Sequence, residues 1–181
     1  MYVLLVRPPR RNYRDVGLCV PPLGLAYIAS ALRSDGHTVS ILDAYALRWS
    51  WEQFSRFLAV EKPDVIGMTA MTPIADIISR AVKIARPYVG KIVIGGPHPT
   101  AMGEKIFNEM PDIDASVVGE GENIAKQLLK WWAQGSPGPP PPGVWVKGFG
   151  FRSPTIPDID TVLMPARDLL PNATYRYLFS T

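Results

Sequence analysis

The chain has 181 residues, of which 47% are hydrophobic, enough to bury the core of one domain. Its formal net charge is only +3, and no basic stripe interleaved with aromatic residues indicates a nucleic-acid module. No run reaches the roughly 18 apolar residues of a membrane span, and the N-terminus lacks the basic lead of a signal peptide. One cysteine, Cys19, excludes an internal disulfide and any iron–sulfur cluster held by several cysteines of this chain, so we expect a cytoplasmic location.

Five apolar, β-rich runs alternate with segments whose apolar residues recur at helical spacing. The predicted strands are residues 2–6, 38–42, 65–70, 91–94 and 115–118. The predicted helices are residues 23–34, 51–60, 74–88, 102–110 and 122–134. Alternating strands and helices indicate parallel βαβ units with right-handed crossovers, so residues 1–134 are predicted to form a doubly wound α/β domain.

The remainder of the chain has a different composition. Residues 135–143, GSPGPPPPG, can be neither helix nor central strand and are predicted to be a linker or an exposed loop. Residues 144–146 and 149–151 are predicted to pair as a short hairpin. A proline-rich tail follows, and residues 144–181 as a whole are too few for a second domain, so we interpret them as a hairpin and a connector.

Ligands of open parallel sheets bind at the carboxyl ends of the strands, so the residues after each strand matter most. The first predicted strand is followed by Arg7, Pro8 and Pro9. The glycine-rich turn of a Rossmann nucleotide site and the Walker loop are both missing there, and the prolines remove backbone donors. A flavodoxin-type phosphate loop would need serine or threonine with glycine after the first strand, and a response-regulator site would need clustered carboxylates there. The chain has neither, so both kinds of site are excluded at this position.

The third and fourth predicted strands end in small residues instead. Gly67 lies within the third strand, and Gly95 and Gly96 follow the fourth. Backbone without large side chains allows a ligand to approach closely, and the hydroxyl groups of Thr69 and Thr72 can bond to its polar groups. We therefore predict a slot for a large, flat ligand beside these two strands.

Several stretches, in this order and spacing, resemble the N-terminal cobalamin (B12)-binding domain of class B radical SAM enzymes. They are VLLVRPP (3–9), PPLGLAYIASALRSDGHTVSILDA (21–44), PDVIGMTAMT (63–72), IGGPHPT (94–100) and VVGEGE (117–122). The stretch MPARDLLP (164–171) is similar to the connector that precedes the radical SAM barrel in that family. The resemblance implies a flavodoxin-like sheet of five parallel strands in the order 2-1-3-4-5.

The resemblance also implies how cobalamin would bind. The corrin would lie across the carboxyl edge of the sheet, and the nucleotide tail with its dimethylbenzimidazole would enter the slot. No residue of this chain is expected to be catalytic or to ligate a metal. The residues expected to contact the cofactor are Pro8, Pro9, Pro22, Leu23, Gly24, Gly67, Thr69, Ala70, Met71, Thr72, Gly95, Gly96, Pro97, His98, Gly119, Glu120 and Gly121.

Two motifs of related proteins are missing. Many cobalamin domains carry Asp-x-His-x-x-Gly, whose histidine ligates cobalt; without it, the resemblance implies cobalamin with its own base displaced and no histidine beneath the cobalt. The Cys-x-x-x-Cys-x-x-Cys motif of radical SAM enzymes is missing too, and the sequence stops about where it would begin. We therefore expect a truncated or separately encoded fragment that is not catalytic alone, whose barrel would bring S-adenosylmethionine and a [4Fe–4S] cluster.

Three functions remain open. The leading hypothesis is the cobalamin-binding domain of a radical SAM methyltransferase or related enzyme, with the barrel in the same longer chain or in a separate partner. The second is a stand-alone corrinoid carrier, which an exposed patch near Trp131, Trp132 and Trp145 would favour. The third is a flavodoxin-like domain that binds another nucleotide or a phosphorylated ligand. Its basic loop would contain Arg7, Arg10, Arg11 and Arg14.

Overall fold

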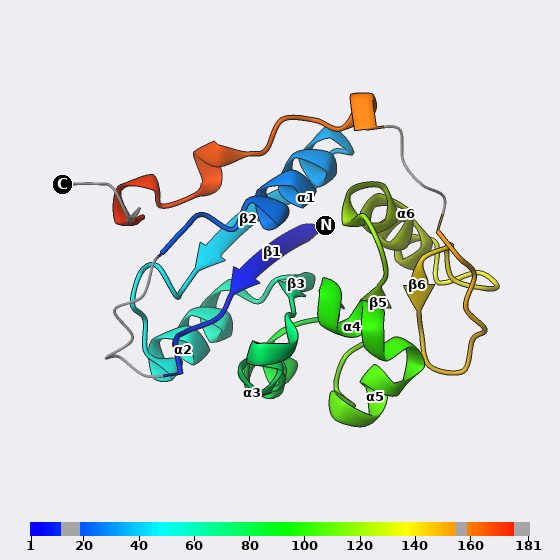
Figure 1. The fold of residues 1–181 in the computed structure, drawn as a ribbon, viewed down its shortest axis with the longest axis horizontal. Coiled ribbons are helices and arrows are strands. Elements are labelled where there is room, and N and C mark those ends of the chain that lie inside the picture. The colour runs from blue at the N-terminus through cyan, green and yellow to red at the C-terminus, as the bar shows by residue number, and fades with distance from the viewer. Residues whose placement is uncertain (12–18, 155–158, 176–181) are drawn as a thin grey trace.

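The computed structural model describes residues 1–11, 19–154 and 159–175 (Figure 1), so Arg14 of the basic loop lies outside the described residues. Six strands form one sheet in the order β2-β1-β3-β4-β5-β6. They are β1 (Tyr2–Arg7), β2 (Thr38–Asp43), β3 (Val65–Thr69), β4 (Lys91–Gly95), β5 (Ala115–Val117) and β6 (Val144–Trp145). The first five pair in parallel, so the predicted α/β fold and strand order 2-1-3-4-5 are confirmed, and the predicted strand bounds differ by one residue at most.

The predicted hairpin after residue 143 is wrong. Strand β6 pairs antiparallel with β5 and becomes an edge strand of the main sheet, which is therefore mixed. Residues 149–151 form no strand; Phe151 instead stacks on Trp145, with ring centroids 4.6 Å apart. Pairing with β5 satisfies backbone groups that the edge of the sheet would otherwise leave open.

Helices cover both faces of the sheet (Figure 1). Helices α1 (Leu23–Ser34) and α6 (Gly121–Ala133) lie side by side on one face. The helices on the opposite face are α2 (Trp51–Glu61), α3 (Ala75–Ala85), α4 (Pro97–Met102) and α5 (Ile106–Glu109). Among the described residues, none of the helices combines the length and the apolar character that a bilayer crossing requires.

Two of the predicted helices are interrupted. The segment expected at 102–110 begins earlier, at Pro97, and is divided into α4 and α5 by a turn at Gly103, whose φ of +55° is unfavourable in a right-handed helix. The segment expected at 74–88 is α-helical only to Ala85 and ends in a 3₁₀ turn that contains Pro87. A proline ring has no N–H to donate to the preceding turn, so it ends regular α-helix there.

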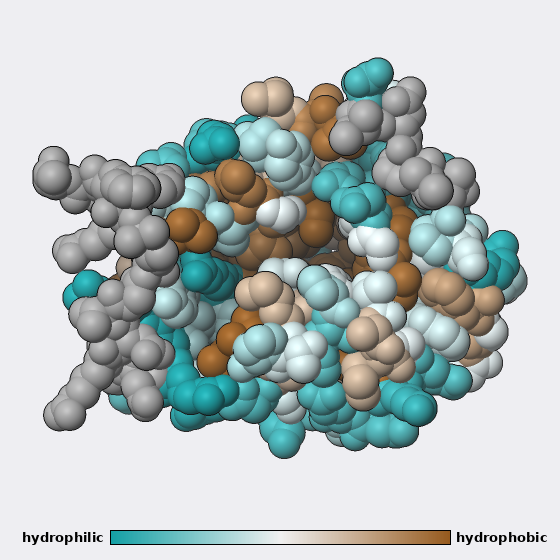
Figure 2. Space-filling view, viewed as in Figure 1, coloured by the Kyte–Doolittle hydropathy of each residue, from teal (hydrophilic) through white to brown (hydrophobic). Residues whose placement is uncertain are grey.

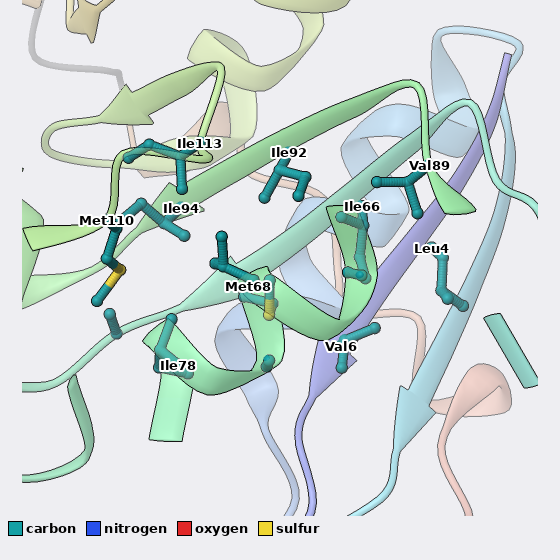
Figure 3. Close-up of a cluster of buried hydrophobic side chains, with 14 of the residues drawn as sticks. Leu4, Val6, Ile66, Met68, Ile78, Val89, Ile92, Ile94, Met110 and Ile113 are labelled. Carbon is teal, nitrogen blue, oxygen red and sulfur yellow. The ribbon is translucent and has the colours of Figure 1, made fainter. Parts of the chain in front are cut away.

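Strand alternation divides the core into two halves, because successive side chains point to opposite faces. On the α2 and α3 face, Leu4, Val6, Ile66 and Met68 pack in the main core cluster (Figure 3). On the α1 and α6 face, the same two strands present Val3, Leu5 and Val65. The positions that follow Val65 on this second face are Gly67 and Thr69, so this half of the core has a gap in its packing.

The last described segment runs back along α1 (Figure 1, orange to red). We call residues 164–175 the strap. Backbone and side-chain bonds fix it to α1, through the pairs Ala166 with Ala26, Met164 with Ser30, and Asp168 with Arg33. At its end the hydroxyl of Tyr175 donates to Asp43 Oδ2 over 3.0 Å, at the carboxyl end of β2. The strap thus holds the outer side of α1 and reaches the edge of the sheet where the strands end.

Candidate functional site

A cavity of about 200 Å³ lies between the sheet and the helices α1 and α6. Residues of β1, β3, β4 and β5 line one side of it, and residues of the two helices line the other. Figure 2 shows a hollow with apolar walls near the middle of the molecule, between these elements. The cavity extends along β3 from Thr69, at the carboxyl end, to Val65, which corresponds to a depth of roughly 13 Å.

Glycines create this cavity. A Cβ atom at Gly67 would lie 2.7 Å from Cδ2 of Leu5, so any larger side chain there would push Leu5 or fill the space. Gly24 on α1 faces open space, with no atom within 4 Å of the place where its Cβ would be. Gly95, the last residue of β4 and the register partner of Thr69, also lines the cavity. The slot predicted from these glycines is therefore a real hollow beneath α1 and α6.

The mouth of the cavity requires glycine for a different reason. Gly96 has a φ of +99°, and a Cβ atom there would lie 2.7 Å from Thr69 Oγ1 and 2.9 Å from the carbonyl oxygen of Ala70. Gly119 also has a positive φ, of +85°, at the turn between β5 and α6. Helix α6 begins at Gly121 without a side-chain cap, so no side chain of its cap residue, Glu120, bonds to its first N–H groups.

The floor of the cavity is apolar. Its side chains are those of Val3, Leu5, Leu25, Ile28, Leu32, Val65, Val93, Val117, Ala125, Leu128 and Leu129. The polar side chains among the lining residues are Thr69, Glu120 and Glu122, all of which lie at the mouth. The cavity can therefore take a flat apolar group inside and polar groups at its entrance.

Eight of the predicted contact residues line this cavity. They are Gly24, Gly67, Thr69, Gly95, Gly96, Gly119, Glu120 and Gly121. The other nine lie outside its lining, in the loops that follow the strands or at the start of α1 and α4: Pro8, Pro9, Pro22, Leu23, Ala70, Met71, Thr72, Pro97 and His98. Met71 is half exposed, whereas Ala70 is fully buried. Contact of these nine residues with a cofactor stays a prediction.

His98 is held by its own chain. Its side chain is buried, with Nδ1 3.2 Å from Thr72 Oγ1 and Nε2 3.0 Å from a carboxylate oxygen of Glu109. Its backbone N–H donates to the carbonyl of Ala70. These bonds tie α4 to α5 and to the loop after β3, which supports a loop-ordering role for the imidazole.

Sequence patterns alone did not reveal a buried polar cluster at the carboxyl end of β2. Asp43 is fully buried; its carboxylate accepts from the N–H of Ala46 and from Tyr175, and lies 3.5 Å from Nη1 of Arg7. Burial, followed by the negative charge of Asp43, raises the pKa of Tyr175. The tyrosine comes 132 residues after the aspartate, so no local spacing signals this contact.

The described arginines of the basic loop contact other residues of the chain. The guanidinium groups of Arg7 and Arg10 each lie 4.0 Å from the ring centre of Tyr45. Arg11 forms a 2.7 Å ion pair with Asp76. Because all three guanidinium groups are already engaged within the chain, these contacts weaken the hypothesis of a flavodoxin-like nucleotide site.

The three tryptophans named for a carrier pack within the domain. Trp131 is buried, and its indole N–H donates to the carbonyl of Pro137. Trp132 and Trp145 are half buried. Trp132 packs against the core cluster of β5 and α6 that contains Trp131, and Trp145 stacks on Phe151. Trp131 therefore fastens the proline-rich segment, and in the described part of the chain these three tryptophans form no broad exposed patch.

Comparison with known proteins defines the class to which this fold and cavity belong. Residues 12–129 match the family model described as the B12 binding domain. The chain therefore belongs to the family of B12-binding domains, and the resemblance predicted from its motifs is confirmed.

Among curated relatives, the chain is 36% identical over 185 residues to an uncharacterized methyltransferase of Pyrococcus horikoshii, with 97% of this chain and 40% of that protein covered. It is also 36% identical over 142 residues to the anaerobic magnesium-protoporphyrin IX monomethyl ester cyclase of Rubrivivax gelatinosus, with 75% of this chain and 25% of that protein covered. The chain thus spans less than half the length of these two relatives.

Solved structures show the same fold. The radical S-adenosylmethionine methyltransferase TsrM from Kitasatospora setae superposes with a TM-score of 0.69 at 23% identity, over 84% of this chain and 30% of that one. The cobalamin-dependent S-adenosylmethionine radical enzyme OxsB superposes with a TM-score of 0.75 at 18% identity, over 93% of this chain and 24% of that one.

Proposed function

We propose that this chain binds cobalamin with the nucleotide base displaced from cobalt and no histidine beneath the metal, as the cobalamin domain of a radical SAM methyltransferase or related enzyme. The observation that carries this proposal is the glycine-formed cavity, with its apolar floor and polar mouth. Membership of the B12-binding family supports the cofactor class, and the shape and lining of the cavity support it as the site of the nucleotide tail.

The cavity fits this tail in size and chemistry. An apolar protein cavity of about 150 Å³ is enough to bind benzene, so a cavity of about 200 Å³ suits a somewhat larger flat ring system. Dimethylbenzimidazole is flat and apolar, like the floor. The ribose and phosphate of the tail are polar, and would meet the Thr69 hydroxyl and the glycine backbone at the mouth.

Neither of the two histidines of the chain is available beneath the cobalt. His98 is bonded to Thr72 and Glu109. His37 precedes β2 and lies beside the amino group of Met1, at the opposite edge of the sheet from the cavity mouth. This supports binding without a histidine ligand.

In this proposal the chain positions the cofactor. Bound cobalamin would supply the group-transfer chemistry, and the residues of this chain would bind its tail, orient it and keep water from it. A radical SAM barrel, with S-adenosylmethionine and a [4Fe–4S] cluster, would come from the rest of a longer protein or from a partner. The parent reaction would be methyl transfer or a related radical reaction.

A retention experiment tests the proposal. The purified chain is mixed with hydroxocobalamin and desalted, and its visible spectrum is recorded; we expect retained cobalamin with a base-off spectrum. Retention with a base-on spectrum would contradict a tail inside the cavity. If neither this chain nor a version extended through a barrel retains cobalamin, the proposal is wrong.

A matched pair of variants tests the cavity itself. Gly67→Val should push Leu5 into the cavity and reduce retention at least tenfold, because the base then has no space. Gly150→Val is the control, since Gly150 has open space around it and lies outside the cavity lining. Equal retention by both variants would show that the base binds elsewhere.

A further inference from the structure

We infer that this cavity selects cobamides by their lower base, favouring an apolar benzimidazole over a purine. The inference rests on the proposed function and adds a specificity to it. It follows from the distribution of polar groups in the cavity, which is uneven along its depth.

Among the residues that the structure describes, no side chain at the floor of the cavity can bond to a purine. Of the side chains that line the cavity, the polar ones are those of Thr69, Glu120 and Glu122, which belong to the end of β3 and to the start of α6. Deeper in the cavity, the residues of β1 and α1 are valine, leucine and isoleucine. A base that passes the mouth therefore meets only hydrocarbon.

The backbone N–H and C=O groups at the floor already have hydrogen-bond partners. Strand β1 pairs with β2 on one side and β3 on the other, and β3 pairs with β1 and β4, so their N–H and C=O groups are bonded within the sheet. The middle turns of α1 and α6 use theirs within the helices. Both bases carry one free nitrogen in the five-membered ring once they are displaced from cobalt. Adenine has in addition an amine and two nitrogens in its six-membered ring, which would give up water without gaining partners, whereas the six-membered ring of dimethylbenzimidazole has no polar atom to desolvate.

The expected discrimination is large enough to measure. Leaving one or two buried polar groups unpaired should weaken binding roughly 10- to 100-fold. We therefore expect the dissociation constant of cobalamin to be roughly 10- to 100-fold lower than that of the cobamide that carries adenine. Cobinamide, which has no lower base, should bind more weakly than cobalamin because it leaves the cavity empty.

Val93 offers a way to alter this preference. It lies on β4 opposite Gly67 in the register, lines the cavity and is half buried. Threonine has nearly the shape of valine, so Val93→Thr places one hydroxyl on the floor and keeps the space. The variant should bind the adenine cobamide more tightly and cobalamin more weakly, narrowing the ratio between them about tenfold.

Val39→Thr is the matched control. Val39 is a buried valine of β2 that packs on the same face of the sheet but does not line the cavity. The same added hydroxyl should leave the ratio of the two affinities as it is in the original chain. Thermal unfolding of both variants shows whether each is folded before its binding is compared.

Equilibrium dialysis of the chain and both variants against cobalamin, adenine cobamide and cobinamide gives the dissociation constants. Tighter binding of cobalamin, with the ratio narrowed by Val93→Thr alone, supports the inference. Equal binding of the two cobamides, both tighter than cobinamide, overturns the inference and leaves the proposed function intact. Equal binding of all three also overturns it, because the base then lies outside the cavity. If none of the three binds, either to this chain or to a version extended through a barrel, the proposed function itself is wrong.

Discussion

Gly96 combines a φ of +99° with two close neighbours, Thr69 Oγ1 and the carbonyl oxygen of Ala70. Gly96→Ala should therefore suffer both backbone strain and a steric conflict, and lower the free energy of unfolding by roughly 2–4 kcal/mol. Gly36→Ala is the control, since Gly36 has a φ of +84° but no atom within 4 Å of a Cβ. Strain alone should cost this variant about 1 kcal/mol.

Urea unfolding of the two variants and the original chain measures this difference. Similar losses for both alanine variants would mean that the loop carrying Gly96 moves aside without difficulty. Such a result would remove the argument that the mouth of the cavity requires a glycine at position 96.

At the residue scale, the sequence predicted the glycines of the cavity but not its floor. A glycine at the end of a strand is informative on its own, because few other residues can adopt its backbone conformation and only glycine has no side chain to block a close approach. Leu5 and Leu129 look like any core leucine, and only the three-dimensional structure shows that they line the same cavity as Gly67. Whether an apolar side chain packs or lines a cavity depends on what lies opposite.

At the element scale, the strap makes its deepest contact through Tyr175 and the buried Asp43. Tyr175→Phe should lower the free energy of unfolding by about 1–3 kcal/mol, because the carboxylate loses a donor that water cannot replace. Tyr2→Phe is the comparison, since its hydroxyl bonds to Glu61 at the surface, where water replaces the partner. That variant should lose less than about 1 kcal/mol.

The contribution of Tyr175 should also depend on pH. Its pKa in the folded chain is raised above the ordinary value near 10, first by burial and then by Asp43. The unfolded chain ionises first, so the stabilisation is complete below about pH 10 and declines as the pH rises beyond it. The stability difference between the original chain and Tyr175→Phe should be constant from pH 7 to about 9 and shrink above about pH 10. A difference that grows in alkali would contradict this assignment.

The strap itself could not have been predicted from local pattern. Its prolines indicate an irregular connector, and that description is right for its backbone. Its partners, however, lie on α1 and β2, more than 130 residues earlier in the chain. The helices were easier to predict, and the spacing of apolar residues predicted the bounds of α1 correctly. The turn at Gly103, which divides α4 from α5, was wrongly predicted to be helical.

At the scale of the whole molecule, binding of cobalamin should stabilise the folded state by mass action. A free concentration of about 100 times the dissociation constant adds about 2.7 kcal/mol, which raises the melting temperature of a domain of this size by roughly 5–10 °C. Differential scanning fluorimetry over a series of cobalamin concentrations measures the shift. A melting temperature that does not rise with concentration would argue against binding to the native state.

The sheet as a whole was predictable because five strands and their crossover helices repeat one pattern, and parallel βαβ units allow few arrangements. The sixth strand was not. Val144 and Trp145 follow a proline-rich loop, and their local sequence suits a hairpin as well as an edge strand. The open edge of β5 decided between the two, and that edge exists only in the assembled sheet.

The strap has a consequence for how the protein is made. The hydrogen bonds from Ser30 to Met164 and from Tyr175 to Asp43 join residues 134 and 132 positions apart. A ribosome releases α1 and β2 well before it has synthesised the strap, and nascent chains begin to fold from the N-terminus. Contacts between such distant segments form slowly, because a long loop must close first. Helix α1 is thus synthesised well before the strap, yet it is among the last parts of the domain to be completed.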